Sequence, residues 1–109
     1  VFGPVGSIFK WSNLDEALTI ANDVEYGLTA SIYTNDFSTA MYLSRKVKVG
    51  YVWINGTNTH FRNVPYGGAK NSGVGREEGL DELLSYTELK AINWTAQTSV
   101  APGSAWQPA

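Results

Sequence analysis

The sequence contains no cysteine and a single histidine, His60, among its 109 residues. Without cysteine the chain can form no disulfide, no thiolate metal site and no thiol nucleophile of its own. One histidine also falls short of the common zinc sites, which take several His or Cys ligands. We therefore expect no metal site and no thiol chemistry from the residues of this chain.

Long apolar runs and an excess of charge of one sign are also missing. The formal net charge is −2, which does not favour a nucleic-acid surface. No stretch approaches the roughly 18 apolar residues that a membrane span requires. The N-terminal stretch "VFGPVGSIFK" has no basic flank before a long apolar run. We expect a soluble cytoplasmic protein with neither nucleic acid nor a membrane among its partners.

Apolar residues, which make up 43% of the chain, follow alternating strand and helix periods. The patterns predict strands over residues 4–11, 28–34 and 51–55 and helices over residues 13–23 and 35–47. Asn13 and Glu16 have the spacing of a capping box at the start of the first helix. Strands separated by helices of this length are normally parallel. The prediction is an α/β fold with a mostly parallel sheet and helices on its faces.

Each predicted helix has one apolar face that should pack on the sheet. The expected buried positions are Leu14, Ala17, Leu18 and Ala21 on the first helix, and Phe37, Ala40, Met41 and Ser44 on the second.

The remainder of the chain reads as a glycine-rich loop over 56–76, a short helix over 76–86 and a strand over 87–93. The 87–93 strand has no local partner, so we expect it to pair with another sheet, such as one in another chain. Residues 94–109 show no period, and we expect them to be extended or mobile.

The loop segment "VPYGGAKNSGVGREEG" (64–79) has the composition of a phosphate-binding loop but not its spacing. In a Walker-type loop the lysine follows a glycine and precedes Ser or Thr, whereas Lys70 precedes its glycine. The glycine spacing also differs by one residue from that of the dinucleotide-binding motif G-x-G-x-x-G. Glu77 and Glu78 would moreover repel phosphate. We interpret the glycines as permitting positive φ and close backbone approach. Lys70 and Arg76 should then bond carbonyls or carboxylates.

Five blocks of the sequence together resemble the C-terminal part of the aldehyde dehydrogenase superfamily, in the order and spacing of that family. They are "FGPV" (2–5), "AND…YGLTASIYTND" (21–36), "VGYVWIN" (49–55), "PYGGAKNSGVGRE" (65–77) and "YTELKAIN" (86–93). The resemblance implies that residues 1–86 are the end of a catalytic domain, residues 87–93 an oligomerisation-type strand and residues 94–109 a tail. It also implies a homo-oligomer formed through the 87–93 strand.

The activity implied by this resemblance is the oxidation of an aldehyde to a carboxylic acid with NAD or NADP. The family uses a cysteine thiolate that attacks the aldehyde and a glutamate-activated water that releases the acid. This chain has no cysteine, and the family's general base and nucleotide-binding domain would lie upstream of Val1. We therefore expect part of an oxidoreductase that is inactive alone and binds no cofactor by itself.

The resemblance assigns no catalytic residue to this chain, but it does assign cofactor and substrate contacts. Phe2 matches the phenylalanine near the nicotinamide ring. Asn55 matches the asparagine that ends the strand beside the active site, and the loop after it lines the substrate tunnel in the family. The implied substrate pocket consists of Asn55, Asn58, Thr59, His60, Phe61 and Tyr66.

Several alternatives remain open from the residues alone. His60 is either a catalytic base or, more simply, a polar pocket wall. Phe61 and Tyr66 either stack on substrate or only pack. The acidic residues Glu77, Glu78, Asp81 and Glu82 either bind a divalent ion or, as we favour, form a solvated helix face. For the whole chain, the alternatives to part of an enzyme are a non-catalytic, self-associating structural module and an independent small-ligand-binding domain.

Overall fold

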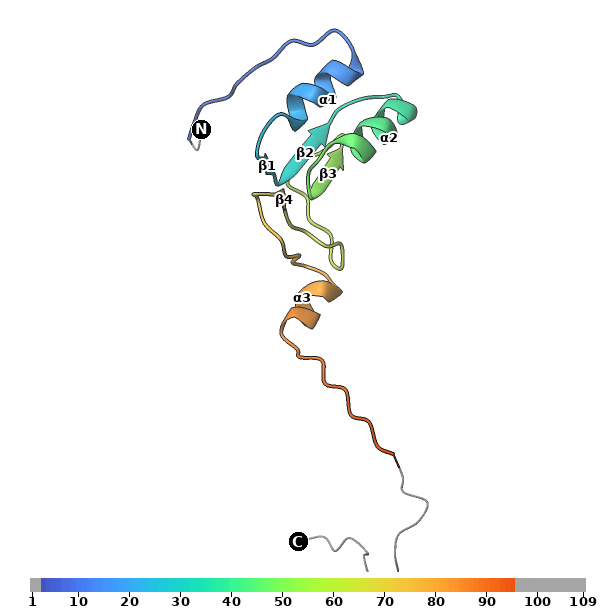
Figure 1. Ribbon diagram of the computed structural model, residues 1–109. Coiled ribbons are helices and arrows are strands. Elements are labelled where there is room, and N and C mark those ends of the chain that lie inside the picture. The colour runs from blue at the N-terminus through green and yellow to red at the C-terminus, as the bar shows by residue number, and fades with distance from the viewer. Residues whose placement is uncertain (1–2, 96–109) are drawn as a thin grey trace, which may run out of the picture.

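The structure, a computed structural model, describes residues 3–95. Its elements are α1 (Leu14–Asn22), β1 (Tyr26–Gly27), β2 (Thr29–Ile32), α2 (Phe37–Lys46), β3 (Tyr51–Ile54), β4 (Ala69–Lys70) and α3 (Leu80–Ser85), as labelled in Figure 1. No helix within residues 3–95 is long and apolar enough to cross a membrane.

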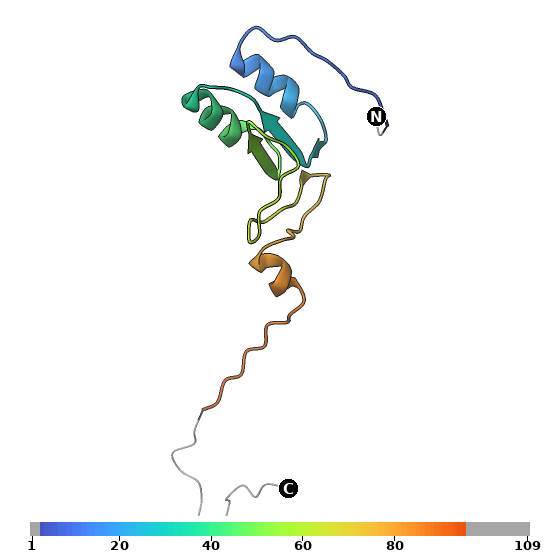
Figure 2. The same cartoon turned by 180° about the vertical axis from the view of Figure 1, so that it is seen from behind.

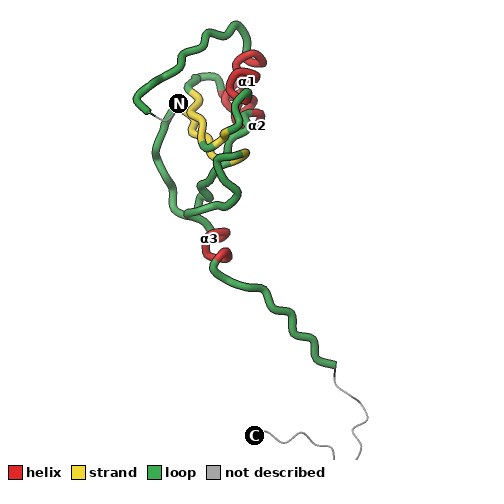
Figure 3. The backbone as a smooth tube through the Cα atoms, turned by 60° about the vertical axis from the view of Figure 1, so that its left-hand side comes forward, coloured by secondary structure: helices red, strands yellow, loops and turns green. Residues whose placement is uncertain are grey.

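The predicted α/β character is confirmed, but the sheet is smaller than expected. Strands β2 and β3 pair in parallel, with Thr29 opposite Tyr51 and Ile32 opposite Ile54. Helix α2 connects them, and Figure 3 shows α1 and α2 on the same side of these strands. The short strands β1 and β4 form a separate antiparallel pair. Within the described residues the parallel part is thus one two-stranded ladder.

Both long helices begin at a capping side chain, as the sequence predicts for α1. The Asn13 Oδ1 accepts a hydrogen bond from the Glu16 amide at 2.9 Å. The Glu16 carboxylate accepts from the amide and the hydroxyl of Ser12, at 2.8 and 2.5 Å, and not from the Asn13 amide. Hydrogen bonds from Ser12 lower the pKa of Glu16. Asp36 caps α2, its Oδ2 accepting from the Thr39 amide at 2.7 Å.

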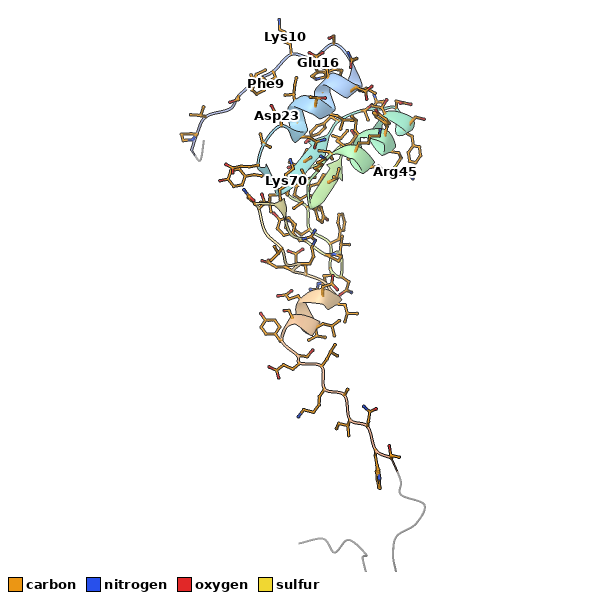
Figure 4. All side chains as sticks on the ribbon, viewed as in Figure 1. Phe9, Lys10, Glu16, Asp23, Arg45 and Lys70 are labelled. Atoms are coloured by element: carbon orange, nitrogen blue, oxygen red, sulfur yellow. The ribbon has the colours of Figure 1, made fainter. Side chains whose placement is uncertain are left out.

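The predicted strand over residues 4–11 does not form. Ile8 is 95% exposed and Phe9 is also exposed, and no strand is assigned to residues 3–11. Figure 4 shows Phe9 and Lys10 on a segment that runs apart from the rest of the described chain. A strand exists only by hydrogen bonding to a neighbour, and an apolar run without one stays irregular.

Residues 86–95 extend away from the other elements, as Figure 2 shows from behind. No strand is assigned to residues 87–93 in this structure, and Leu89 and Ile92 are fully or largely exposed. The division of the chain at residues 86 and 87 stays a prediction. Most of the predicted tail, residues 96–109, lies outside the described residues.

The core of the described chain is thin. Its buried hydrophobic residues are Leu18, Ala40, Tyr51 and Trp53. Leu18 and Ala40 were expected on the inner helix faces, but Ala21 and Phe37 are exposed, which corrects those two positions. Two strands of four residues offer too little surface to cover both helices along their length.

Candidate functional site

Four aromatic rings gather where the loop that follows β3 returns to the sheet. Tyr51 and Trp53 share one face of β3 because side chains alternate along a strand, and their ring centroids are 4.8 Å apart. The His60 ring lies 4.5 Å from Tyr66, 6.1 Å from Tyr51 and 6.0 Å from Trp53, centroid to centroid. The strand and the loop therefore meet through an aromatic cluster, which we define as Tyr51, Trp53, His60 and Tyr66.

Two side-chain hydrogen bonds attach the loop over residues 56–65 to other parts of the chain. The Trp53 Nε1 donates a hydrogen bond to the Thr59 carbonyl at 2.7 Å. The His60 Nδ1 lies 2.7 Å from the Glu78 Oε1. Asn58 and Asn63 both have positive φ, 54° and 65°, a conformation that Asn adopts more readily than most residues. The loop is held by side-chain bonds, since no strand is assigned to it.

An open depression of about 700 Å³ lies beside the loop. Its lining residues are His60, Phe61, Arg62, Asn63, Glu78, Gly79 and Glu82. Of the predicted pocket residues, the structure therefore brings His60 and Phe61 to this depression, with the exposed aromatic ring of Phe61 at its surface. Most of these lining side chains are polar or charged, and Phe61 is the one large apolar side chain among them.

Asn55 lies at a different place from His60 and Phe61. Its Oδ1 accepts from the Thr34 amide and its Nδ2 donates to the Thr34 carbonyl, each at 2.9 Å. It lines a second depression, of about 350 Å³, with Phe37 and Ile54. The structure thus uses the Asn55 amide to join the ends of β2 and β3, a role that the sequence reasoning missed.

The remaining predicted pocket residues within the described chain, Asn58, Thr59 and Tyr66, do not line the 700 Å³ depression. Thr59 supplies the carbonyl that Trp53 bonds, and Asn58 is exposed. Tyr66 exchanges two backbone hydrogen bonds with Glu77, at 2.9 and 2.7 Å. Phe2, the predicted nicotinamide contact, lies outside the described residues.

The prediction that Lys70 and Arg76 bond protein carbonyls is confirmed. The Lys70 Nζ donates to the carbonyls of Asn22 and Val24, at 3.0 and 2.8 Å, at the C-terminal end of α1. Figure 4 labels Lys70 and Asp23 in this region. The Arg76 guanidinium donates to the carbonyls of Gly68 and Gly75, at 2.7 and 2.8 Å. Both cations are therefore used within the fold.

The glycines of the 64–79 segment permit the close backbone approach that the sequence predicts. A Cβ on Gly50 would lie 1.7 Å from the Gly67 carbonyl oxygen, and a Cβ on Gly68 would lie 2.6 Å from the backbone of Ser72. Gly73 has φ 145°. The contact between Gly50 and Gly67 packs the segment against the start of β3, where a side chain has no room.

Glu78 is a residue whose role the sequence did not indicate. The acidic run was interpreted as a solvated helix face, yet Glu78 reaches the His60 ring on the loop. Its φ is 62°, so its backbone lies in the left-handed region. Acidic residues just before a helix are common for electrostatic reasons alone, so the sequence carries no signal for this pairing. Within residues 3–95 no group of three or more His, Cys, Asp or Glu side chains could hold a metal ion.

The fold and the site define an α/β unit with an aromatic-lined loop beside an open depression. Residues 1–92 match the family model described as "Aldehyde dehydrogenase family". The chain belongs to the aldehyde dehydrogenase family, which confirms the resemblance seen in the sequence.

Two curated relatives illustrate the similarity. The chain is 50% identical over 93 residues to aldehyde dehydrogenase tropH of Talaromyces stipitatus, covering 85% of this chain and 18% of the relative. It is 43% identical over 93 residues to aldehyde dehydrogenase (NAD(P)+) 2 of Saccharomyces cerevisiae, again 85% of this chain and 18% of the relative. The chain therefore spans about a fifth of the length of these relatives.

Solved structures give the same result. The NAD+ complex of an aldehyde dehydrogenase from Bacillus cereus superposes with a TM-score of 0.77 at 40% identity, over 82% of this chain and 18% of that one. An indole-3-acetaldehyde dehydrogenase of P. syringae, solved with NAD+ and IAA, also has a TM-score of 0.77, at 42% identity and the same coverage. The α/β fold of the described residues is thus that of a segment of these enzymes.

Proposed function

We propose that this chain forms part of an enzyme that oxidises an aldehyde to a carboxylic acid with NAD or NADP. The observation that supports the proposal most is the family match over residues 1–92. The relatives carry the same activity in their names, and the yeast relative is named for NAD(P)+. In this proposal the chain contributes a wall of the substrate site, and the nucleophile belongs to residues outside this sequence, which has no cysteine.

The loop over residues 56–65 is the part that we assign to the substrate. His60 and Phe61 line the 700 Å³ depression, and Thr59 is fixed to Trp53 beside it. We assign Asn58 and Tyr66 to the same wall, and we propose that Asn55, which follows β3 and lines the second depression, belongs to the substrate pocket of the intact enzyme. An aromatic wall binds the apolar body of an aldehyde through buried area, while polar groups orient its carbonyl.

The chemistry of this reaction comes mainly from groups that this chain does not contain. NAD or NADP, when bound, would supply the hydride acceptor for this oxidation. The residues of this chain would orient the aldehyde and exclude water from it. We assign Phe2 to the nicotinamide side of the site, and we propose that the chain alone binds no cofactor and is inactive.

A chimera tests the proposal. The segment of the Talaromyces enzyme that this chain matches is replaced by this chain, and aldehyde-dependent NAD(P)H formation is followed by absorbance. We expect the chimera to oxidise aldehydes, whereas the same enzyme with the matched segment deleted is inactive. A folded chimera without activity, at a cofactor concentration that saturates the parent enzyme, would contradict the proposal.

A second proposal concerns self-association through residues 87–93. Leu89 and Ile92 are exposed on an extended segment without a partner strand, and such an edge pairs readily with another copy. We propose a homo-oligomer formed through this segment, either within the enzyme or as a structural module. Light scattering of the purified chain over a concentration series should give a discrete mass above one copy, reduced by Leu89→Lys. A monomer at all concentrations would contradict this proposal.

The compartment is a further proposal, and we place the enzyme in the cytoplasm. One relative, from Arabidopsis thaliana, is named as mitochondrial. Fractionation of cells that express the protein would decide between the two compartments.

A further inference from the structure

We propose that Glu78 is a positioning residue that fixes the substrate-facing loop by holding the His60 ring. This inference rests on the function proposed above and adds to it a residue outside the predicted pocket. Glu78 acts through His60 and makes no contact with the reacting atoms. Three observations support this role. The backbone of Glu78 is held by its neighbours, the His60 ring packs on other aromatic rings, and the loop has few other attachments.

Glu78 is held in place from both sides. The backbone of Glu77, the preceding residue, exchanges two hydrogen bonds with Tyr66. The Glu78 amide donates to the Glu82 Oε2 at 2.7 Å, and Glu82 belongs to the first turn of α3. A left-handed backbone at a non-glycine residue costs free energy and persists where its surroundings enforce it. The backbone that carries the Glu78 side chain is therefore held in one conformation.

The His60 ring is held between this carboxylate and the other three rings of the aromatic cluster. Its Nδ1 lies 2.7 Å from the Glu78 Oε1, and its plane is only 14° from that of Tyr51. An ionised carboxylate can only accept a hydrogen bond, so Nδ1 carries the proton. In the neutral ring Nε2 is then an acceptor. Glu78 thus determines both the orientation of the ring and its tautomer.

The loop has few other attachments that could replace this one. Its second tertiary side-chain bond within the described residues runs from Trp53 to the Thr59 carbonyl. The exposed Phe61 follows His60 directly and lines the same depression. Freeing His60 would therefore release Phe61 as well. Misplacing a substrate-orienting group by about 1 Å is enough to weaken productive binding substantially.

The first test uses the chain itself, because His60 is its only histidine and gives a single set of imidazole signals, from Nδ1 and Nε2, in a nitrogen NMR spectrum. The wild-type chain should show the tautomer protonated at Nδ1. Glu78→Ala should change these signals and shift the amide resonances of residues 58–61. Glu77→Ala is the matched control and should change neither. An unchanged tautomer and unchanged loop resonances in Glu78→Ala would overturn the proposal.

The second test uses the chimera and separates binding from chemistry. Glu78→Ala should raise KM for the aldehyde about tenfold, which corresponds to one charge-assisted hydrogen bond. The value of kcat should change less than about twofold, because the reacting groups are untouched. His60→Ala should raise KM to a similar extent. In His60→Asn the KM should stay close to that of the unsubstituted chimera, because the Asn amide donates from nearly the position of Nδ1.

The outcomes distinguish the two proposals. An inactive unsubstituted chimera counts against the proposed function, and the NMR comparison still decides whether Glu78 holds the loop. An active chimera whose KM is unchanged by Glu78→Ala would overturn the positioning role. Equal effects of Glu77→Ala and Glu78→Ala would also overturn it, because they would show a general effect of removing negative charge.

Discussion

Lys70 and Arg76 resemble ligand-binding cations in the sequence, but in the structure they hydrogen-bond to backbone carbonyls of the chain itself. Lys70 joins β4 to the end of α1 through two carbonyls, and Arg76 joins two points of the glycine-rich segment. Carbonyls at a helix C-terminus lack intrahelical partners and carry partial negative charge, so an ammonium group there is favourable. Lysine and arginine often bind phosphate in other proteins. In this chain they donate hydrogen bonds to backbone carbonyls.

Replacing Lys70 should therefore lower stability. Lys70→Met removes two charge-assisted hydrogen bonds, and we expect the free energy of unfolding to fall by about 2 kcal/mol. Urea denaturation of the chain at fixed protein concentration, followed by tryptophan fluorescence, measures the change. Lys48→Met is the control, because the Lys48 side chain makes no hydrogen bond within residues 3–95; its effect should stay within about 0.5 kcal/mol. Equal effects of both substitutions would contradict the bracing role.

Gly50 is the residue at which a side chain is least tolerated. A Cβ at this position would meet the carbonyl oxygen of Gly67 at 1.7 Å, and both groups are attached directly to the backbone, so neither can rotate away. We expect Gly50→Ala to destabilise the chain by about 3 kcal/mol, the upper end of overpacking costs. Gly56→Ala is the matched control, since nothing lies within 4 Å of its Cβ. A neutral Gly50→Ala in the same urea experiment would show that β3 and the 64–79 segment do not pack closely.

At the level of elements, helix α2 depends on an ionised cap. Hydrogen bonds from Thr39 hold the pKa of Asp36 below its ordinary value of 3.8. A carboxyl whose pKa is lowered on folding stabilises the folded chain above the unfolded pKa. This stabilisation is lost as the pH falls through the folded pKa. Acid should therefore weaken α2 from its N-terminus.

The measurement is helical circular dichroism during acid titration below about pH 4, where an ordinary Asp begins to protonate. Asp36→Asn keeps an efficient cap that does not titrate, so the loss of helix signal on acidification should be smaller than in the wild type. Glu16 makes an equivalent contribution to α1, because Ser12 lowers its pKa. Some acid dependence should therefore remain in Asp36→Asn. Identical titration curves for the two chains would contradict the capping account.

The sequence predicted the elements that carry a period or a cap and missed those that depend on distant partners. Helices α1 and α2 and strands β2 and β3 were located because their apolar spacing extends over several residues. The β1–β4 pair joins Tyr26 to Lys70 through two-residue strands, which show no period. Residues 4–11 have strand-like composition, but composition does not show whether a neighbouring strand is available.

The sequence predicted only part of the candidate site, because the rest depends on contacts between residues far apart in the chain. The family resemblance indicated the loop over residues 56–65, and the structure places His60 and Phe61 at one depression. The pairing of His60 with Glu78, 18 residues later, depends on the left-handed backbone at Glu78. Nothing in the local sequence indicates that conformation, because Glu is not a residue that favours it.

At the level of the whole molecule, apolar side chains remain exposed on several separate segments. Ile8, Trp11, Phe37, Leu84 and Leu89 are examples, and they contrast with a core of few buried residues. Large exposed apolar areas mark surfaces that are covered by other protein. In our proposal, the rest of an aldehyde dehydrogenase subunit and its neighbouring subunits cover these side chains.

The most direct test of the central claim is a crystal structure of the chimera with cofactor and a bound aldehyde or its acid product. We expect atoms of Phe61 and His60 within about 4 Å of the ligand, the usual limit for contact. We also expect His60 to remain paired with Glu78. A ligand bound out of reach of residues 58–61 would contradict the assignment of this loop to the substrate.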